Sequence, residues 1–144
     1  MQDVYSREYT VKDEHIDFQG IMDGLYYPYY LEECRHQFMA DTLKYDLKTA
    51  AASGTNVVLS QFGLKFKRSL TKGQKFTVTC SAHPDKGGKP QFHIKQAILR
   101  DGKLVTEAVF TATCVKSTGG RSFIPEDIAA AVANSEPIDG VTFQ

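Results

Sequence analysis

The sequence has no excess charge of either sign, because 17 Lys and Arg residues are balanced by 17 Asp and Glu residues. Proteins that bind nucleic acids or membrane surfaces normally carry a basic excess, so the balance argues against both partners. No apolar run approaches the ~20 residues of a membrane span, and the charged N-terminus lacks the apolar stretch of a secretory signal. We therefore expect a soluble, cytoplasmic protein with no nucleic-acid or membrane partner.

Cysteine is also scarce. The three cysteines are Cys34, Cys80 and Cys114, and no two of them have the close spacing of a zinc site or a redox pair. No two histidines have metal-ligand spacing either. Each cysteine stands among apolar neighbours, as is typical of small core residues in a reducing compartment. We expect no metal site.

The chain has no internal repeat and no low-complexity stretch. Its 144 residues are 42% hydrophobic and 24% charged, which is typical of one globular domain that needs no disulfide or metal to fold. We expect a single domain over residues 1–135 and a C-terminal tail over residues 136–144. The last ten residues are expected to be frayed.

The first third of the chain predicts one strand and one long helix. Residues 2–13 alternate weakly between polar and apolar side chains, and the glycine-containing segment 14–26 predicts a loop. Residues 27–45 carry apolar side chains three or four positions apart, which predicts an amphipathic helix. A shorter helix is expected over residues 46–53, ending near Gly54.

From residue 55 the pattern changes to the period of two that is typical of strands. Phe62, Leu64 and Phe66 define a half-buried strand. The other three strands are expected over residues 73–81, 91–100 and 103–116, separated by a glycine-rich turn and by the hairpin signal Asp101-Gly102. Residues 125–134 predict a short helix. This order indicates an α+β fold, with one long helix wrapped by a curled antiparallel sheet of about five strands.

The loop before the long helix is the most promising place for chemistry. A helix N-terminus presents unpaired N–H groups and a partial positive charge, which can polarise a carbonyl and stabilise an oxyanion. Asp17 lies in this loop, where its carboxylate could attack the same carbonyl or activate a water. The loop glycines would permit a ligand to approach the backbone closely. An aspartate before a helix is also commonly a capping or turn residue.

A series of motifs resembles the 4-hydroxybenzoyl-CoA thioesterase family of hotdog-fold proteins, over roughly residues 5 to 130. The series begins with Asp17-x-x-Gly20, continues with Tyr27, and leads into a helix that carries acidic residues and Arg35. The later matching stretches are residues 57–68, 73–78, 101–104, 112–115 and 124–128. The resemblance implies a hotdog fold, hydrolysis of acyl-CoA thioesters, and a homodimer, with dimers pairing further and the active site at the dimer interface.

The resemblance also implies roles for particular residues. Asp17 would be the catalytic carboxylate, and the backbone N–H of Gly24 would polarise the thioester carbonyl. The pair Asp23-Gly24 departs from the Tyr-His or Asn-Asn pairs common in the family, and we interpret Asp23 as a helix cap. Coenzyme A would be part of the substrate, and no cofactor is expected. The sequence leaves open whether Asp17 acts as nucleophile or base, which acyl group is cleaved, and whether CoA or acyl carrier protein carries it.

Candidate substrate-binding residues surround this loop and the densest basic run. Two tyrosines at the helix start could line an acyl pocket, and the basic side chains could bind the CoA phosphates. Alternatively, the tyrosines could pack between the helix and the sheet, and the basic side chains could simply form a solvated strand face. The substrate-binding candidates are Gly20, Ile21, Tyr26, Tyr29, Lys65, Lys67 and Arg68.

Two other functions remain as alternatives. His15 and Asp17 could form the His-plus-acid pair of a hotdog hydratase or dehydratase, although a lone histidine near a strand end is usually structural. The altered Asp23-Gly24 pair would also suit a non-catalytic acyl-CoA-binding protein.

Overall fold

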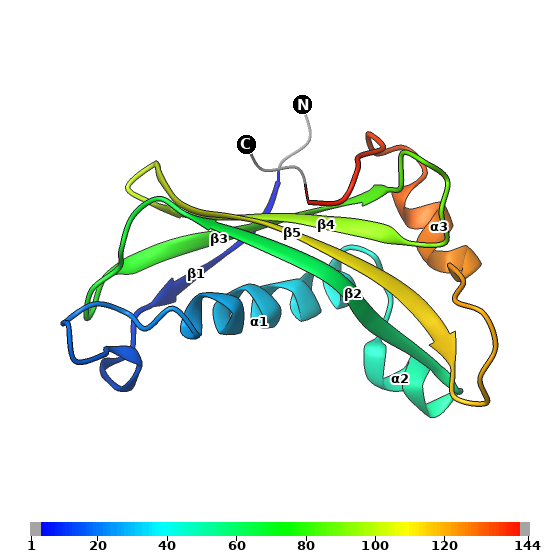
Figure 1. The fold of residues 1–144 in the computed structure, drawn as a ribbon, viewed down its shortest axis with the longest axis horizontal. Coiled ribbons are helices and arrows are strands. Elements are labelled where there is room, and N and C mark those ends of the chain that lie inside the picture. Colours follow the sequence, from blue (N-terminus) through cyan, green and yellow to red (C-terminus); the bar gives the residue numbers. More distant parts are fainter. Residues whose placement is uncertain (1–3, 142–144) are drawn as a thin grey trace.

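The computed structural model describes residues 4–141, in which five antiparallel strands form one sheet. The strands lie side by side in the order β1-β3-β4-β5-β2 (Figure 1). The five-stranded α+β architecture expected from the sequence is therefore confirmed. The elements in chain order are β1 (Tyr5–Thr10), a 3-10 turn (Asp13–His15), α1 (Tyr26–Asp41), α2 (Leu47–Ala52), β2 (Thr55–Phe66), β3 (Lys75–Pro84), β4 (Phe92–Arg100), β5 (Lys103–Lys116) and α3 (Glu126–Val132).

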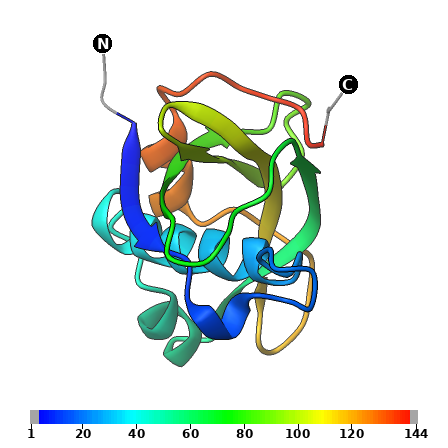
Figure 2. The same cartoon turned by 90° about the vertical axis from the view of Figure 1, so that its left-hand side faces the viewer.

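Helix α1 lies along the concave face of the sheet, which curls over it (Figure 2). The helix packs closest to β3 and β1. Its buried side chains recur three or four residues apart, and alternate residues of β3 and β4 face them. The core formed in this way includes Tyr30, Leu31, Cys34, Phe38, Phe76, Val78, Cys80, Ile94 and Ile98, each at most 3% exposed.

The long helix is shorter than predicted, because α1 ends at Asp41 and not at residue 45. Lys44 adopts a left-handed backbone conformation with φ 56°, which turns the chain away from the helix axis. The Asp46 carboxylate then caps α2 by accepting a hydrogen bond from the Lys48 N–H at 3.0 Å. Tyr45 is buried although it lies beyond the end of α1. Its position fits the helical spacing of apolar residues, which is why the sequence predicted a longer helix.

Strand β2 is longer and more exposed than predicted. It starts at Thr55, but a register shift between Leu59 and Gln61 interrupts the alternation, so the sequence shows a regular period of two only after this point. Phe62 and Phe66 do share the face toward α1, since they pair with inward-facing positions of β5. They are nevertheless 52% and 51% exposed, because β2 is an edge strand that α1 meets mainly at one end, where Phe66 contacts Tyr27.

The prediction that the C-terminal residues are frayed is wrong for the described part, which ends at residue 141. Ile138 forms a parallel bridge with Asp85; its N–H donates to the Pro84 carbonyl at 3.1 Å, and its carbonyl accepts from the Lys86 N–H at 2.9 Å. The segment runs over the convex side of the sheet (Figure 1). Residues 142–144 lie outside the described range.

A buried hydrogen-bonded pair, His93 and Asp85, lies beneath this segment. His93 is fully buried on β4, its Nε2 lies 2.8 Å from the Asp85 carboxylate, and its Nδ1 lies 2.8 Å from the Thr111 hydroxyl. Burial alone would raise the pKa of Asp85. Hydrogen bonds from Gln91, His93 and the Lys89 N–H outweigh that effect and hold the pKa of Asp85 well below its ordinary range.

Asp85→Asn should lower the free energy of unfolding near neutral pH by about 1–3 kcal/mol, because the charge-assisted hydrogen bonds are lost. A carboxyl whose pKa is lowered in the folded state stabilises the protein above its unfolded-state pKa of about 3.9, and this stabilisation is lost as the pH falls through the folded-state value. Urea unfolding between neutral pH and about pH 3 should therefore show the difference from wild type shrinking at the acidic end. The control is Asp139→Asn, an exposed residue of the same segment, and an equal loss in both variants would contradict the assignment.

Candidate active site

Asp17 sits in a tightly closed loop between β1 and α1. Ile16 and Met22 form an isolated antiparallel bridge across the base of this loop. The Asp17 N–H donates to the Ile21 carbonyl at 2.9 Å. Gly20 closes the turn with φ +85°, a backbone conformation that residues other than glycine rarely adopt. The loop therefore holds Asp17 in a fixed position just before the helix.

The Asp17 carboxylate is half-buried and oriented by its own loop. Its Oδ1 accepts from the Gln19 N–H at 2.8 Å, and its Oδ2 lies 3.3 Å from the Gln19 Nε2. Each carboxylate oxygen can accept a further hydrogen bond, so the group is still able to bind a water or face a substrate.

The Asp17 charge acts on the first turn of α1. Burial raises the pKa of Tyr27, and the negative charge of Asp17 raises it further, against the opposing effect of a hydrogen bond from the Leu70 N–H to the Tyr27 hydroxyl. The carboxylate and the beginning of the helix are thus close enough to interact electrostatically.

The entrance to α1 is formed by Asp23 and Gly24. Asp23 accepts from the Leu25 N–H at 3.0 Å through its carboxylate and from the Tyr26 N–H at 3.0 Å through its carbonyl. Asp23 therefore stabilises the turn that leads into α1. The interpretation of Asp23 as the helix cap is wrong, because the cap residue is Leu25 and no side chain caps the helix.

The backbone around Gly24 is open. Within residues 4–141, no group accepts a hydrogen bond from the Gly24 N–H. A Cβ added at Gly24 would meet no atom within 4 Å, so there is room for a ligand beside the amide. This arrangement provides a donor for a carbonyl oxygen at the electropositive end of α1.

His15 is enclosed by tyrosines and is only 7% exposed. Its Nδ1 lies 2.8 Å from the Tyr30 hydroxyl, and its ring stacks on Tyr26 with the centroids 3.8 Å apart. This environment leaves His15 little access to a substrate, which removes the main support for a hydratase. Tyr26 packs on His15, whereas Tyr29 is 46% exposed and is the more open of the two predicted acyl-pocket residues.

The sequence did not predict two exposed apolar side chains at the site. Phe18 is 97% exposed and directly follows Asp17, and Leu25 is 79% exposed at the start of α1. The sequence did contain a sign of the first, because Phe18 stands between Asp17 and Gln19 in a segment predicted to be a loop. Large apolar residues exposed in this way commonly mark a binding surface.

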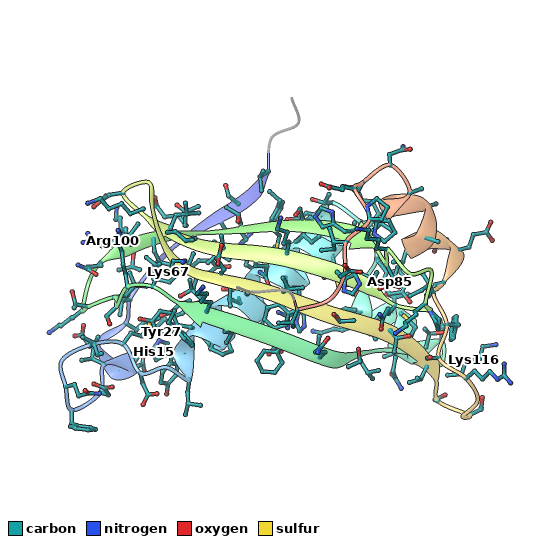
Figure 3. All side chains as sticks on the ribbon, turned by 45° about the horizontal axis from the view of Figure 1, so that its top comes forward. His15, Tyr27, Lys67, Asp85, Arg100 and Lys116 are labelled. Atoms are coloured by element: carbon teal, nitrogen blue, oxygen red, sulfur yellow. The ribbon has the colours of Figure 1, made fainter. Side chains whose placement is uncertain are left out.

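The basic run lies at the same end of the molecule. The ring of Phe66 packs edge-on against Tyr27 with the centroids 5.1 Å apart, which brings the end of β2 to the start of α1. Lys67 and Arg68 follow directly and are exposed. Figure 3 shows Lys67 at the same end as His15 and Tyr27, far from Lys116. Lys65 lies opposite Glu107 in the register of β2 and β5. Both residues are on the convex face of the sheet, so Lys65 points away from α1.

Neither a metal cluster nor a membrane helix is found in the described part of the chain. Residues 4–141 contain no group of three or more His, Cys, Asp and Glu side chains placed to hold a metal ion. No helix in this range is both long and apolar enough to cross a membrane.

Comparison with known proteins identifies relatives in sequence and in fold. Over 78 residues the chain is 28% identical to the chloroplastic acyl-acyl carrier protein thioesterase ATL3 of Arabidopsis thaliana; the match covers 54% of this chain and 40% of that protein. SAV2348 from Staphylococcus aureus, solved in complex with CoA, superposes with a TM-score of 0.81 at 17% identity, covering 100% of this chain and 91% of that chain. The 1,4-dihydroxy-2-naphthoyl-CoA thioesterase Slr0204 from Synechocystis superposes with a TM-score of 0.81 at 12% identity, covering 92% of this chain and 98% of that chain.

The solved structures confirm the hotdog fold. The family model that matches describes the Thioesterase-like superfamily and spans residues 11–132, which include the Asp17 loop, α1 and strands β2 to β5. The resemblance inferred from the motifs is therefore confirmed, and the chain belongs to the Thioesterase-like superfamily.

Proposed function

We propose that the protein hydrolyses small or medium acyl-CoA thioesters to the free acid and CoA. The observation that carries this proposal is the half-buried Asp17 carboxylate, whose charge acts on Tyr27 in the first turn of α1, together with a Gly24 N–H in the same loop that no described group accepts. Membership of the superfamily supports thioester hydrolysis. CoA is favoured as the carrier because structural neighbours include CoA thioesterases and a complex with CoA.

The geometry supports a simple division of roles. The thioester carbonyl oxygen would accept the Gly24 N–H, and the helix dipole would stabilise the negative charge that develops on it. Asp17 would either attack the carbonyl carbon, expelling the CoA thiolate and forming an anhydride that water then hydrolyses, or take a proton from the water that attacks. Trapping the anhydride separates the routes, and so does transfer of labelled water oxygen into Asp17, which occurs when water attacks the Asp17 carboxyl carbon of the anhydride. Neither route needs a cofactor.

The substrate would lie across the Asp17 loop. The backbone at Gly20 and Ile21 would flank the thioester, while the exposed ring of Tyr29 would contact the acyl group. Lys67 and Arg68 would bind the phosphates of CoA from the end of β2.

We also infer that two copies of the chain pair through β2, as the family resemblance implies. β2 is a 12-residue edge strand with exposed apolar side chains, whereas the opposite edge, β1, has six residues and carries Arg7 and Glu8. Long apolar edges favour pairing, and short charged edges oppose it. The exposed apolar residues of β2 are Val58, Leu59, Phe62 and Phe66. Such dimers would pair further into a dimer of dimers.

Asp17→Asn should reduce kcat/KM by about 10²- to 10⁴-fold, the range expected for loss of a catalytic acid–base group. Thiol release from a panel of aliphatic and aromatic acyl-CoAs measures the effect, with thermal unfolding as a check on the fold. Asp13→Asn, which removes an exposed carboxylate paired with Lys72, should leave turnover unchanged. Unchanged turnover in Asp17→Asn would remove this residue from the mechanism. Hydration of an enoyl-CoA without thiol release, or binding of acyl-CoA without turnover, would overturn the proposed function.

Lys67→Met should raise KM for acyl-CoA up to about fivefold with little change in kcat, because exposed ion pairs contribute ~0.2–1 kcal/mol. The effect should weaken at high salt. Acyl-pantetheine lacks the nucleotide phosphates, so its KM should not respond to the substitution. Lys116→Met, at the far end of the molecule (Figure 3), is the matched control. A KM change of the same size for acyl-pantetheine would argue against phosphate binding by Lys67.

Phe62→Lys should weaken the dimer, because it places a charge on the apolar edge strand. Sedimentation should give the wild type a mass of at least twice the 16.0 kDa chain and shift the variant toward the monomer. Val4→Lys, at an exposed position beside the opposite edge strand, is the control. A monomeric wild type at micromolar concentration would refute the pairing.

A further inference from the structure

A groove runs along the side of α1 that faces β2. Its lining residue nearest the proposed active site in sequence is Glu32, which follows Tyr29 by three residues, about one helical turn along α1. Its volume is about 210 Å³, and its walls beyond the entrance are mainly apolar. The apolar lining residues are Met39, Leu47, Val57, Leu59, Ile94 and Ala112.

Arg35 is an exception among these lining residues. Arginine side chains are seldom fully buried, but Arg35 is only 5% exposed. It follows Leu31 by four residues and Cys34 by one, so helical geometry places it beside the buried stripe. Its guanidinium carbon lies 4.0 Å from the centre of the Phe110 ring.

The Arg35 guanidinium has few partners for a buried charge. Its Nη1 donates to the Gln96 Oε1 at 3.2 Å, and no carboxylate of residues 4–141 lies within 4.0 Å of it. Burial lowers the pKa of Arg35, and the nearby negative charge of Glu32 only partly opposes this. A guanidinium has five N–H donors, and buried charges are normally paired. Arg35 therefore presents further N–H donors on the wall of the groove that could bind a ligand.

We propose that Arg35 recognises an oxygen on the distal part of the acyl group, so that the enzyme prefers oxygen-substituted acyl thioesters to plain alkyl ones. The inference rests on the proposed function and specifies its substrate class. A plain methylene chain in the groove would leave the buried donors unsatisfied, whereas a carboxylate, carbonyl or hydroxyl oxygen would accept them. A carboxylate fits best, because it also neutralises the charge.

The position of Arg35 along the helix indicates where this oxygen lies. Arg35 follows Tyr26 by nine residues, which corresponds to roughly 13 Å along an α-helix. The oxygen is therefore separated from the thioester carbonyl at Gly24 by several bonds. A substituent next to the thioester would not reach it.

The test compares kcat/KM for hexanoyl-, octanoyl- and decanoyl-CoA with the values for their ω-hydroxy and ω-carboxy derivatives. At the matching length, the wild type should prefer an oxygenated substrate by about 10- to 100-fold, the range expected for hydrogen bonds to a charged group. The difference should lie mainly in KM, because the contact is far from the reacting carbon. Comparing the hydroxy and carboxy series shows whether the site requires charge.

Arg35→Met should reduce this preference to about one, whatever it does to turnover in general. If Arg35 served only to join α1 to the sheet through Gln96, its loss would affect all substrates alike and leave the ratio unchanged. Arg121→Met, at an exposed arginine outside the groove, should keep the wild-type ratio. If Arg35→Met does not fold, Arg35→Lys keeps the charge but loses the planar fork, and the ratio must then fall in that variant.

Several results would overturn the inference. A wild-type ratio of one at every chain length would remove the substrate preference, and an unchanged ratio in a folded Arg35 variant would remove the role of this residue. Either result would leave the proposed function intact as long as plain acyl-CoAs are hydrolysed in an Asp17-dependent manner. No turnover of any thioester would overturn the proposed function, and the inference with it.

Discussion

The packing of a single helix against the concave face of a wider sheet governs this structure. Five strands span roughly 19 Å between the outermost strand axes, whereas a helix with its side chains is about 10–12 Å across. α1 packs closest to β3 and β1, so the inner face of β2 remains largely uncovered. The half-exposed Phe62 and Phe66, the groove beside α1 and the apolar edge of β2 all follow from this mismatch in width.

The proposed active site depends equally on where α1 begins. The bridge between Ile16 and Met22 closes the Asp17 loop, and the hydrogen bonds that Asp23 accepts then stabilise the turn that leads into the helix. The carboxylate and the electropositive end of the helix are thus held together by backbone hydrogen bonds within a short segment. Such local positioning is precise, because few rotatable bonds separate the two groups.

Two buried polar groups in this molecule differ in how fully they are satisfied. His93 has partners on both ring nitrogens, Asp85 and Thr111, and lies beneath the C-terminal segment, so its contacts account for its burial. Arg35 has one hydrogen bond and one aromatic contact beside an open groove. Burial of an incompletely paired charge lowers the stability of the folded protein, and a ligand that pairs with the charge would offset this cost. That difference is why we assign a ligand to Arg35 and a structural role to His93.

The sequence by itself determined the order of the elements, the single long helix, the antiparallel sheet and the Asp17 loop, because these depend on periodicity and on contacts between near neighbours. It also showed the family, since the motifs from Asp17 to Arg35 keep their spacing. Only the tertiary structure decided the end of α1, the exposure of β2, the docking of the C-terminal segment and the burial of Arg35. Each of these depends on which surfaces meet across the fold, and a residue's distant neighbours are not encoded in its local periodicity.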